Sequence, residues 1–338
     1  MTKSTTRVAA DLETFTQTEI TAKDVVAKAG RKNLIINGGF DVWQRGESFT
    51  SVGSGYSADR FFQSVYGGAT PNVTKVAGFG DFRNAIRYTG VNGGAGEQLE
   101  LEHRIEGINL PQTGMLTLSY WVRGSKVGSF KAGRLINGTT GVTNTGRTDV
   151  EVSTDWSRVT VTVSALAATD AQYYRLFWAD SLLSYMSDDS VWLEFTGVQL
   201  ELGSVATDFE HRSYGEELAL CQRYYETSFA HGVTLSNGPS STSLVSDWMT
   251  GIASNRSNAS ATIFFKVRKR VAPTLNDYGA SNGYLGYKNM TDATDFAWNQ
   301  SAVGARAPTQ VGFMLSQGFS NGNSFYIQFH YTADAEFY

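Results

Sequence analysis

The sequence has few of the residues that build disulfide or metal frameworks. Cys221 is the only cysteine in 338 residues, so no disulfide can form within the chain and no thiolate cluster can hold zinc or iron–sulfur. The four histidines, His103, His211, His231 and His330, show no ligand spacing. The sequence therefore predicts no metal site and no other cofactor.

Excess charge and long apolar runs are missing as well. The 28 Lys and Arg against 32 Asp and Glu give a formal net charge of −4, which provides no positive field for nucleic acid. No run approaches the 18 or so apolar residues of a membrane span, and residues 1–30 contain no apolar core of a secretory signal. We expect no nucleic-acid partner, no membrane insertion, and synthesis in a cytoplasm.

Aromatic residues and glycine are abundant instead. The chain has 20 Phe, 16 Tyr, 7 Trp and 35 Gly but only 5 Pro, a composition typical of short strands and tight turns. Apolar and polar residues alternate in Leu116–Val122, where Leu116, Leu118, Tyr120 and Val122 share one face. Further predicted strands are Asn33–Asn37, Val159–Val163, Tyr173–Trp178, Val191–Phe195, Ala261–Val267, Val311–Leu315 and Ser324–Tyr331.

These segments predict an all-β fold with three parts. Residues 1–30 cannot bury a core alone and form either an N-terminal attachment arm or a disordered terminus. Residues 31–213 form a jelly-roll β-sandwich, and residues 214–338 form a linker helix followed by a second, smaller β-sandwich. In the predicted helix Tyr214–Tyr225, Leu218, Cys221 and Tyr225 share one face, so Cys221 is interpreted as a core residue rather than a reactive thiol.

No catalytic motif stands out. The histidines lie in no recognisable catalytic signature, and the glycine clusters lack the Lys-Ser/Thr of a phosphate-binding loop. Asp188, Asp189 and Glu194 are candidates for a glycosidase pair, since two carboxylates a few ångströms apart suffice. Adjacent aspartates before a strand also suit a solvated turn. We expect that the chain is not an enzyme.

Two tryptophans occupy the polar face of predicted strands. Trp121 shares its face with Thr117, Ser119 and Arg123, and Trp192 shares its face with Glu194 and Thr196. A flat ring beside hydrogen-bonding side chains suits stacking against a sugar. The candidate carbohydrate-binding residues are Trp121, Arg123, Trp192 and Glu194. The alternative is that this face packs against the other sheet, a loop or a neighbouring subunit.

Three stretches carry extended sequence motifs. The first runs Arg-Lys-Asn-Leu-Ile-Ile-Asn-Gly-Gly-Phe-Asp-Val-Trp-Gln-Arg-Gly over residues 31–46, followed by Ser-Ala-Asp-Arg-Phe-Phe over 57–62. The second is residues 196–226, and the third is Phe-His-Tyr-Thr-Ala-Asp-Ala-Glu-Phe over residues 329–337, with residues 266–274 upstream. These stretches resemble a family of bacteriophage tail-fibre and receptor-binding proteins, and residues 196–226 are similar to that family's junction between its two modules. The resemblance spans most of residues 31–338.

The start and end of the first module carry a second resemblance. Asn33–Phe40 and Val198–Gly203 are similar to the first and last strands of jelly-roll carbohydrate-binding modules, which pair near the chain ends. Residues 154–156, Thr-Asp-Trp, resemble a core tryptophan turn, which implies a structural role for Trp156. The resemblance also implies a structural calcium near Asp41 or Glu201, although the sequence alone predicts no metal.

The resemblance implies a homotrimeric virion protein assembled in the host cytoplasm. Residues 1–30 would attach it to phage tail or capsid proteins, and its ligand would be a glycan of the host cell surface. The leading hypothesis is a non-catalytic tail fibre. The alternatives are a structural head fibre or capsid decoration protein with no required ligand, and a depolymerase that cleaves the glycan.

Overall fold

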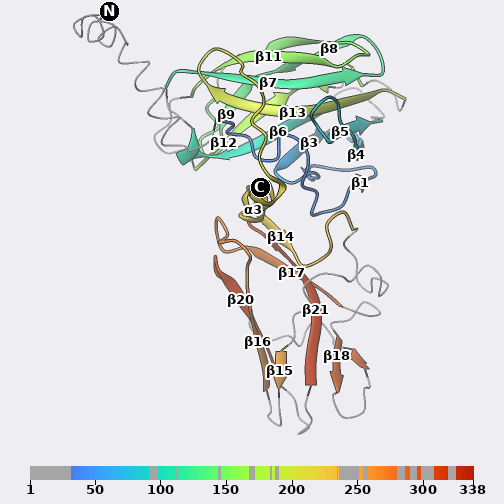
Figure 1. Cartoon of the computed structure of the whole chain (residues 1–338), viewed down its shortest axis with the longest axis vertical. Helices are drawn as coiled ribbons and strands as arrows, with labels where there is room; N and C mark the ends of the chain where they lie inside the picture. Colours follow the sequence, from blue (N-terminus) through green and yellow to red (C-terminus); the bar gives the residue numbers. More distant parts are fainter. Residues whose placement is uncertain are drawn as a thin grey trace, which may run out of the picture.

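Strands dominate the described part of the chain (Figure 1). The computed structural model describes residues 32–90, 98–110, 113–143, 146–166, 172–182, 185–186, 190–233, 235, 251–253, 258–279, 286–289, 295–297, 308–318 and 325–338. Within these ranges one α-helix, α3 (Tyr214–Gln222), and one 3-10 turn, η1 (Gly107–Asn109), interrupt the strands. The prediction of an all-β fold with one short helix is confirmed.

Two antiparallel sheets form a sandwich from the first two thirds of the chain. Sheet A has the order β1-β4-β5-β13-β7-β11, with bounds Ser48–Phe49, Asn72–Ala77, Asn84–Thr89, Trp192–Leu202, Met115–Gly124 and Ser157–Ser164. Sheet B has the order β2-β3-β6-β12-β9, with bounds Gly55–Tyr56, Phe61–Tyr66, Gln98–Glu106, Tyr173–Ala179 and Arg134–Asn137. A separate pair joins β8 (Gly128–Ala132) to β10 (Thr148–Val152).

The sandwich core lies between the inner faces of sheets A and B. The alternation predicted for Leu116–Val122 is observed in β7, whose Leu116, Leu118, Tyr120 and Val122 are all buried. At the centre, the Trp178 and Phe195 rings meet edge to face, with their centroids 4.9 Å apart. Because aromatic pairs of this geometry add to the free energy of burial, they help to fix the spacing between the two sheets.

The polar face of β7 is less open than the sequence indicates. Thr117 and Ser119 are buried because the segment after β13 lies over them. Thr117 Oγ1 donates to the carbonyl of Gly203 at 2.8 Å, and Gln199 Nε2 donates to the carbonyl of Asp208 at 3.2 Å. Trp121, farther along the same face, is half-buried.

The predicted strand Asn33–Asn37 is wrong as a strand, although the segment does lie beside β13. Leu34 N donates to Leu200 O at 2.9 Å, but the Asn33 side chain takes the place of further ladder bonds. Its Oδ1 accepts from Ile35 N and Leu200 N, and its Nδ2 donates to Val198 O. Side-chain hydrogen bonds of this kind compete with regular strand pairing.

Three side chains from beyond β13 hold this segment. Glu210 accepts from the backbone N–H groups of Lys32 and Asn33, at 3.2 and 2.8 Å. Arg212 donates to the Ile35 carbonyl at 3.1 Å, and Glu217 accepts from Asn37 N at 2.5 Å. We call these contacts the entry–exit clasp, because they join the point where the chain enters the sandwich to the point where it leaves.

A second set of strands follows the helix. One sheet has the order β14-β21-β18-β19, with β15 and β17 also paired to β21; the bounds are Tyr225–Thr227, Phe325–Asp334, Gly286–Asn289, Asp295–Ala297, Gly251–Ala253 and Thr274–Gly279. β16 (Asn258–Phe264) pairs with β20 (Gly312–Gly318). The strands predicted near residues 261–267, 311–315 and 324–331 thus exist, with shifted ends.

Helix α3 is shorter than predicted. Ser213 caps its N-terminus by accepting from Glu216 N, and the helix ends at Gln222. Tyr225 belongs to β14 instead, because pairing with β21 begins there and places Tyr225 opposite Asp334. Cys221 is fully buried, which confirms its interpretation as a core residue. No helix among the described residues is long and apolar enough to cross a membrane.

Buried ionic contacts connect the sandwich to the C-terminal strands. The end of the chain lies beside α3, between the two sets of strands (Figure 1). There Arg60 forms an ion pair with Glu336, and both side chains are buried. Tyr56 Oη donates to the carbonyl of Phe337 at 2.8 Å, and the Phe337 ring stacks on Tyr173 with the centroids 4.5 Å apart. We call this set of contacts the junction.

Candidate functional site

A row of three charged side chains crosses the outer face of sheet A. The strand register pairs Glu194 of β13 with Arg87 of β5 and with Arg123 of β7. Arg87 Nε lies 2.7 Å from Glu194 Oε1, and Arg123 Nε lies 2.6 Å from Oε2. The Glu194 side chain is 1% exposed, whereas those of Arg87 and Arg123 are 35% and 34% exposed. The carboxylate therefore lies beneath the two guanidinium groups and fixes their positions.

Aromatic rings adjoin this row on both sides. Arg87 Cζ lies 4.7 Å from the ring centroid of Trp192, and Arg123 Cζ lies 5.0 Å from that of Trp156. The Phe79 ring stacks on Trp156, with the centroids 5.6 Å apart and the planes 22° apart. A guanidinium group over an aromatic face is attracted by the ring quadrupole, so each ring is held by more than packing.

The sixth member of the cluster is Trp121. Its ring centroid lies 5.2 Å from that of Phe79, which belongs to the loop between β4 and β5. All six side chains are half-buried or exposed. We call them the aromatic–arginine platform, with Glu194 as its buried support: Phe79, Arg87, Trp121, Arg123, Trp156 and Trp192.

The structure brings the predicted site residues together on one face, in two different roles. Trp121, Arg123 and Trp192 lie in the platform and reach solvent. Glu194 is almost fully buried, and both of its carboxylate oxygens are bonded to arginine. A ligand on the platform would therefore contact the arginines, and Glu194 would act through them.

Sequence reasoning missed the other half of the platform. Trp156 was expected to be structural, but it is half-buried and lies outside the sandwich core. Arg87 could have been found only by pairing β5 with β13, since nothing in its local sequence indicates a carboxylate opposite. Phe79 lies in a Gly-Phe-Gly loop, where strand alternation gives no signal.

The proposed carboxylate pair is not assembled among the described residues. Asp188 and Asp189 lie outside the described residues, and Glu194 is already bonded to two arginines. Of the calcium candidates, Asp41 Oδ1 accepts from Asn84 at 2.7 Å, and Glu201 accepts from Thr207 N at 3.0 Å. The described part of the chain has no group of three or more His, Cys, Asp or Glu side chains suited to a metal ion.

Sheet B carries a second cluster of charges, and it is internally paired. Arg175 donates to both oxygens of Glu102, at 2.8 and 2.6 Å, and Arg134 donates to Glu100 at 2.6 Å. Burial would raise the pKa of Glu102, but the hydrogen bonds and charge of Arg175 and the charge of Arg104 outweigh it, so that pKa is lowered. For Glu100 burial dominates and raises the pKa. Because its acids are matched by arginines, this cluster serves best as a rigid support.

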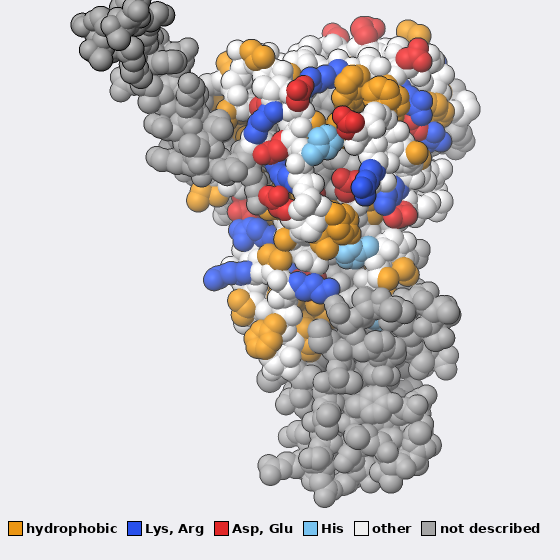
Figure 2. All heavy atoms as spheres, in the orientation of Figure 1, with side chains coloured by type: hydrophobic (Ala, Val, Ile, Leu, Met, Phe, Trp, Pro, Cys, Tyr) orange, Lys and Arg blue, Asp and Glu red, His pale blue; other side chains and the backbone are white. Residues whose placement is uncertain are grey.

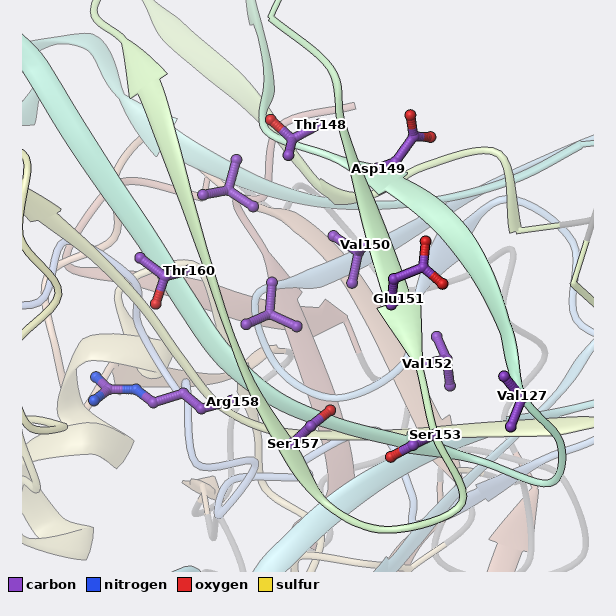
Figure 3. A pocket seen from close by; sticks show the side chains of 12 residues that line it. Val127, Thr148, Asp149, Val150, Glu151, Val152, Ser153, Ser157, Arg158 and Thr160 are labelled. Atoms are coloured by element: carbon purple, nitrogen blue, oxygen red, sulfur yellow. The ribbon is translucent and has the colours of Figure 1, made fainter.

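Two kinds of hollow lie near the platform. One, of about 520 Å³, opens between β10 and β11 at the side of the sandwich (Figure 3). Its apolar lining consists of Val127, Val150, Val152, Val159 and Val161, with hydroxyl and charged side chains around them. No aromatic side chain lines it, so it offers no ring for stacking. The other kind has aromatic side chains in its lining, and one hollow of this kind adjoins Trp121. Figure 2 shows acidic, basic and hydrophobic side chains interspersed over one face of the sandwich.

Comparisons with known proteins give no family. No family model matches the chain, and no curated protein matches it. Solved structures do match about half of the chain, and carbohydrate-binding modules are among them. A CBM4 structure matches with 15% identity and a TM-score of 0.33, over 49% of this chain and 98% of its own.

Two further structures illustrate the range of matches. The CBM22-1 xylan-binding domain from Paenibacillus barcinonensis matches with 12% identity and a TM-score of 0.30, over 48% of this chain and 99% of its own. The enzymatically active domain of tailspike protein 4 from bacteriophage CBA120 matches with 12% identity and a TM-score of 0.35, over 51% of this chain and 21% of its own. These identities and TM-scores are too low to assign a ligand to this chain.

Proposed function

We propose that this chain is a non-catalytic glycan-binding protein of a bacteriophage virion, acting in a tail fibre that attaches the particle to a host surface polysaccharide. The observation that carries the glycan-binding part is the aromatic–arginine platform: four rings and two guanidinium groups in one cluster that solvent reaches.

The platform has the two kinds of group that sugar recognition needs. A pyranose ring has an apolar face, which stacks on an aromatic side chain, and hydroxyls at its edge, which need hydrogen-bond partners. Trp192 and Trp156 supply rings, and the N–H groups of Arg87 and Arg123 not used by Glu194 supply donors. Because strand pairing and Glu194 fix these groups before binding, little side-chain entropy is lost when a ligand binds.

The virion part of the proposal rests on the sequence resemblance of residues 31–338 to phage fibre proteins. It includes a homotrimer and an attachment arm in residues 1–30, which lie outside the described residues. Three linked platforms would multiply the effect of a modest single-site affinity. Light scattering should then give about 111 kDa, three times the chain mass of 36.9 kDa. Deletion of residues 1–30 should prevent incorporation into particles and leave the melting temperature unchanged, because the sequence of that segment has a sparse apolar pattern with Phe15 as its one aromatic residue.

The glycan-binding part is tested by Trp121→Ala and Trp192→Ala on a glycan array and on host cells, with melting temperature measured in parallel. Loss of one stacked ring should weaken binding by about 1–2 kcal/mol, or roughly tenfold per site. Tyr66→Ala is the matched control, because Tyr66 is an exposed aromatic residue on sheet B, away from the platform. Its binding should equal that of the unmodified protein.

Two results would contradict the proposal. A large fall in melting temperature for both tryptophan variants would show that these rings are structural. Replacing a core tryptophan by alanine lowers the free energy of unfolding by about 3–5 kcal/mol. An array on which the unmodified protein binds no glycan would leave the platform without a sugar ligand. The chain would then fit a structural head fibre or capsid decoration better.

A further inference from the structure

Two adjoining hollows extend from the edge of the platform. The first, of about 330 Å³, has Phe79 and Trp121 at one end and Phe82, Phe209 and His211 at the other. The second, of about 500 Å³, is lined by Phe82 and His211 together with Asp41, Asn84, Ser213 and Tyr214. Asp81, Phe82 and His211 line both hollows, so the hollows meet there.

The first hollow is continuous with the platform. Phe79 and Trp121 belong to both, and their ring centroids lie 5.2 Å apart. At the far end, the centroids of Phe82 and His211 lie 5.3 Å apart, and those of Phe82 and Phe209 lie 5.0 Å apart. Aromatic rings therefore line the first hollow beside the platform and again where it meets the second hollow.

The walls of this path are fixed by β13. Gly197, at φ +65°, allows the Phe82 ring to rest directly on the strand, because an added Cβ would lie 2.5 Å from that ring. Thr196 Oγ1 donates to Asn84 O at 2.8 Å and so holds the end of the loop that carries Phe82. Farther along β13, Gln199 Oε1 accepts from Glu210 N at 2.8 Å and so holds the segment that carries Phe209 and His211. The path is preorganised rather than formed by movable side chains.

The second hollow differs in chemistry from the platform. Its lining includes Asp41, Asn84, His211 and the hydroxyl of Tyr214, which together offer both donors and acceptors. Each hollow reaches the volume range of sites for drug-sized ligands, so a single sugar ring on the platform would leave both empty. Rings at the platform and in the first hollow, followed by polar groups in the second hollow, fit a chain of sugars better than one terminal sugar.

We propose that the platform and the two hollows form one long groove that binds a linear oligosaccharide along several consecutive sugar residues, from Trp192 to Tyr214. This inference rests on the proposed glycan-binding function. It adds that the ligand is an extended chain, with the platform stacking the sugars at one end and the second hollow hydrogen-bonding those at the other. His211 and Asp81 would contact the middle of the chain.

The experiment measures affinity against chain length. The probe is the array glycan with the strongest signal, cut by mild acid hydrolysis and sorted by size from the disaccharide upward. Affinity for the unmodified protein should rise with length over several residues. His211→Ala and Asp81→Ala, both exposed positions, should lower affinity for long fragments about three- to tenfold and leave the disaccharide unaffected. Trp192→Ala should lower both.

The control and the contrary outcomes separate the two proposals. The control is Val127→Ala, which changes the separate hollow between β10 and β11 and leaves the proposed groove intact. This variant should bind fragments of every length like the unmodified protein. Affinity that is already maximal for the disaccharide and unchanged in His211→Ala and Asp81→Ala overturns the long groove and leaves the platform in place. An array with no bound glycan overturns the proposed function, and the groove with it.

Discussion

Replacing Arg60 by methionine should extend the dependence of the protein's stability on pH to higher pH. Arg60 is 1% exposed, pairs with the fully buried Glu336, and lies with its Cζ 3.5 Å from the ring centroid of Tyr224. Removal of one partner of a buried pair costs about 3–5 kcal/mol, because it leaves the other charge uncompensated. Arg60 has φ +71°, and methionine carries the same Cβ as arginine, so the variant adds no backbone strain.

The pH dependence follows from what Glu336 must then do. Burial already raises its pKa, and the charges of Arg60 and Arg45 oppose that rise. Without Arg60 the folded-state pKa moves further above the unfolded value of about 4.3. A carboxyl with a raised folded-state pKa stabilises the fold below the unfolded pKa, and this contribution is lost as pH rises through the folded-state pKa. Between the folded-state pKa of Glu336 in the unmodified protein and its higher value in the variant, Arg60→Met should lose about 1.4 kcal/mol per pH unit relative to the unmodified protein.

Urea unfolding at about pH 5 and about pH 8, followed by tryptophan fluorescence and circular dichroism, measures this effect. The Arg60→Met/Glu336→Gln double variant is the matched control, because it removes the group that must take up a proton. It should recover most of the stability lost at the higher pH. A single variant that loses less than about 1 kcal/mol at both pH values would refute the reasoning, since the junction would then not depend on the buried pair.

Three further outcomes test other parts of the structure. Burial would raise the pKa of Glu106, but hydrogen bonds from Arg223 and Tyr224 and the charges of Arg223 and Arg60 together outweigh it and lower that pKa. The contribution of Glu106 to stability should therefore be lost as pH falls below about 4, and Glu106→Gln should flatten that acid limb in urea titrations. Gly197→Ala should lower the free energy of unfolding by at least about 1–2 kcal/mol in thermal melts, because it forces a side chain into left-handed backbone and against Phe82; an unchanged melting temperature would contradict the φ observed there. Burial raises the pKa of the Cys221 thiol, so a thiol reagent should react with the native protein only at the rate of unfolding, and fast labelling would place the thiol at the surface.

The sequence predicts best those features that depend on neighbours along the chain. Alternation in β7 assigned the inward face correctly, and Trp121 and Trp192 were placed on the outer face because strand period is two. Glu194 was placed on the same face, but its burial depends on Arg87, which is 107 residues away and becomes its neighbour only through the pairing of β5 with β13.

Features that depend on irregular backbone were missed. The residues that follow Asn33 have the apolar composition of a strand. The Asn33 side chain nevertheless accepts hydrogen bonds from backbone N–H groups that would otherwise bond to a partner strand. Phe79 joins the platform from a loop, where no period applies. The junction pairs Arg60 with a residue 276 positions away, and neither local sequence indicates an ionic partner.

The entry–exit clasp determines which contacts of the sandwich bear a force that pulls on the two ends of this domain. Tension applied to Lys32 from one direction and to α3 from the other passes through Glu210, Arg212 and Glu217, because these side chains bridge the two ends directly. The strands between residues 48 and 202 form a closed loop off this path, attached to it by the hydrogen bonds of Asn33 and Leu34 to β13. The platform belongs to that loop. We therefore expect its geometry to change little as tension along the chain varies, up to the force at which the clasp opens.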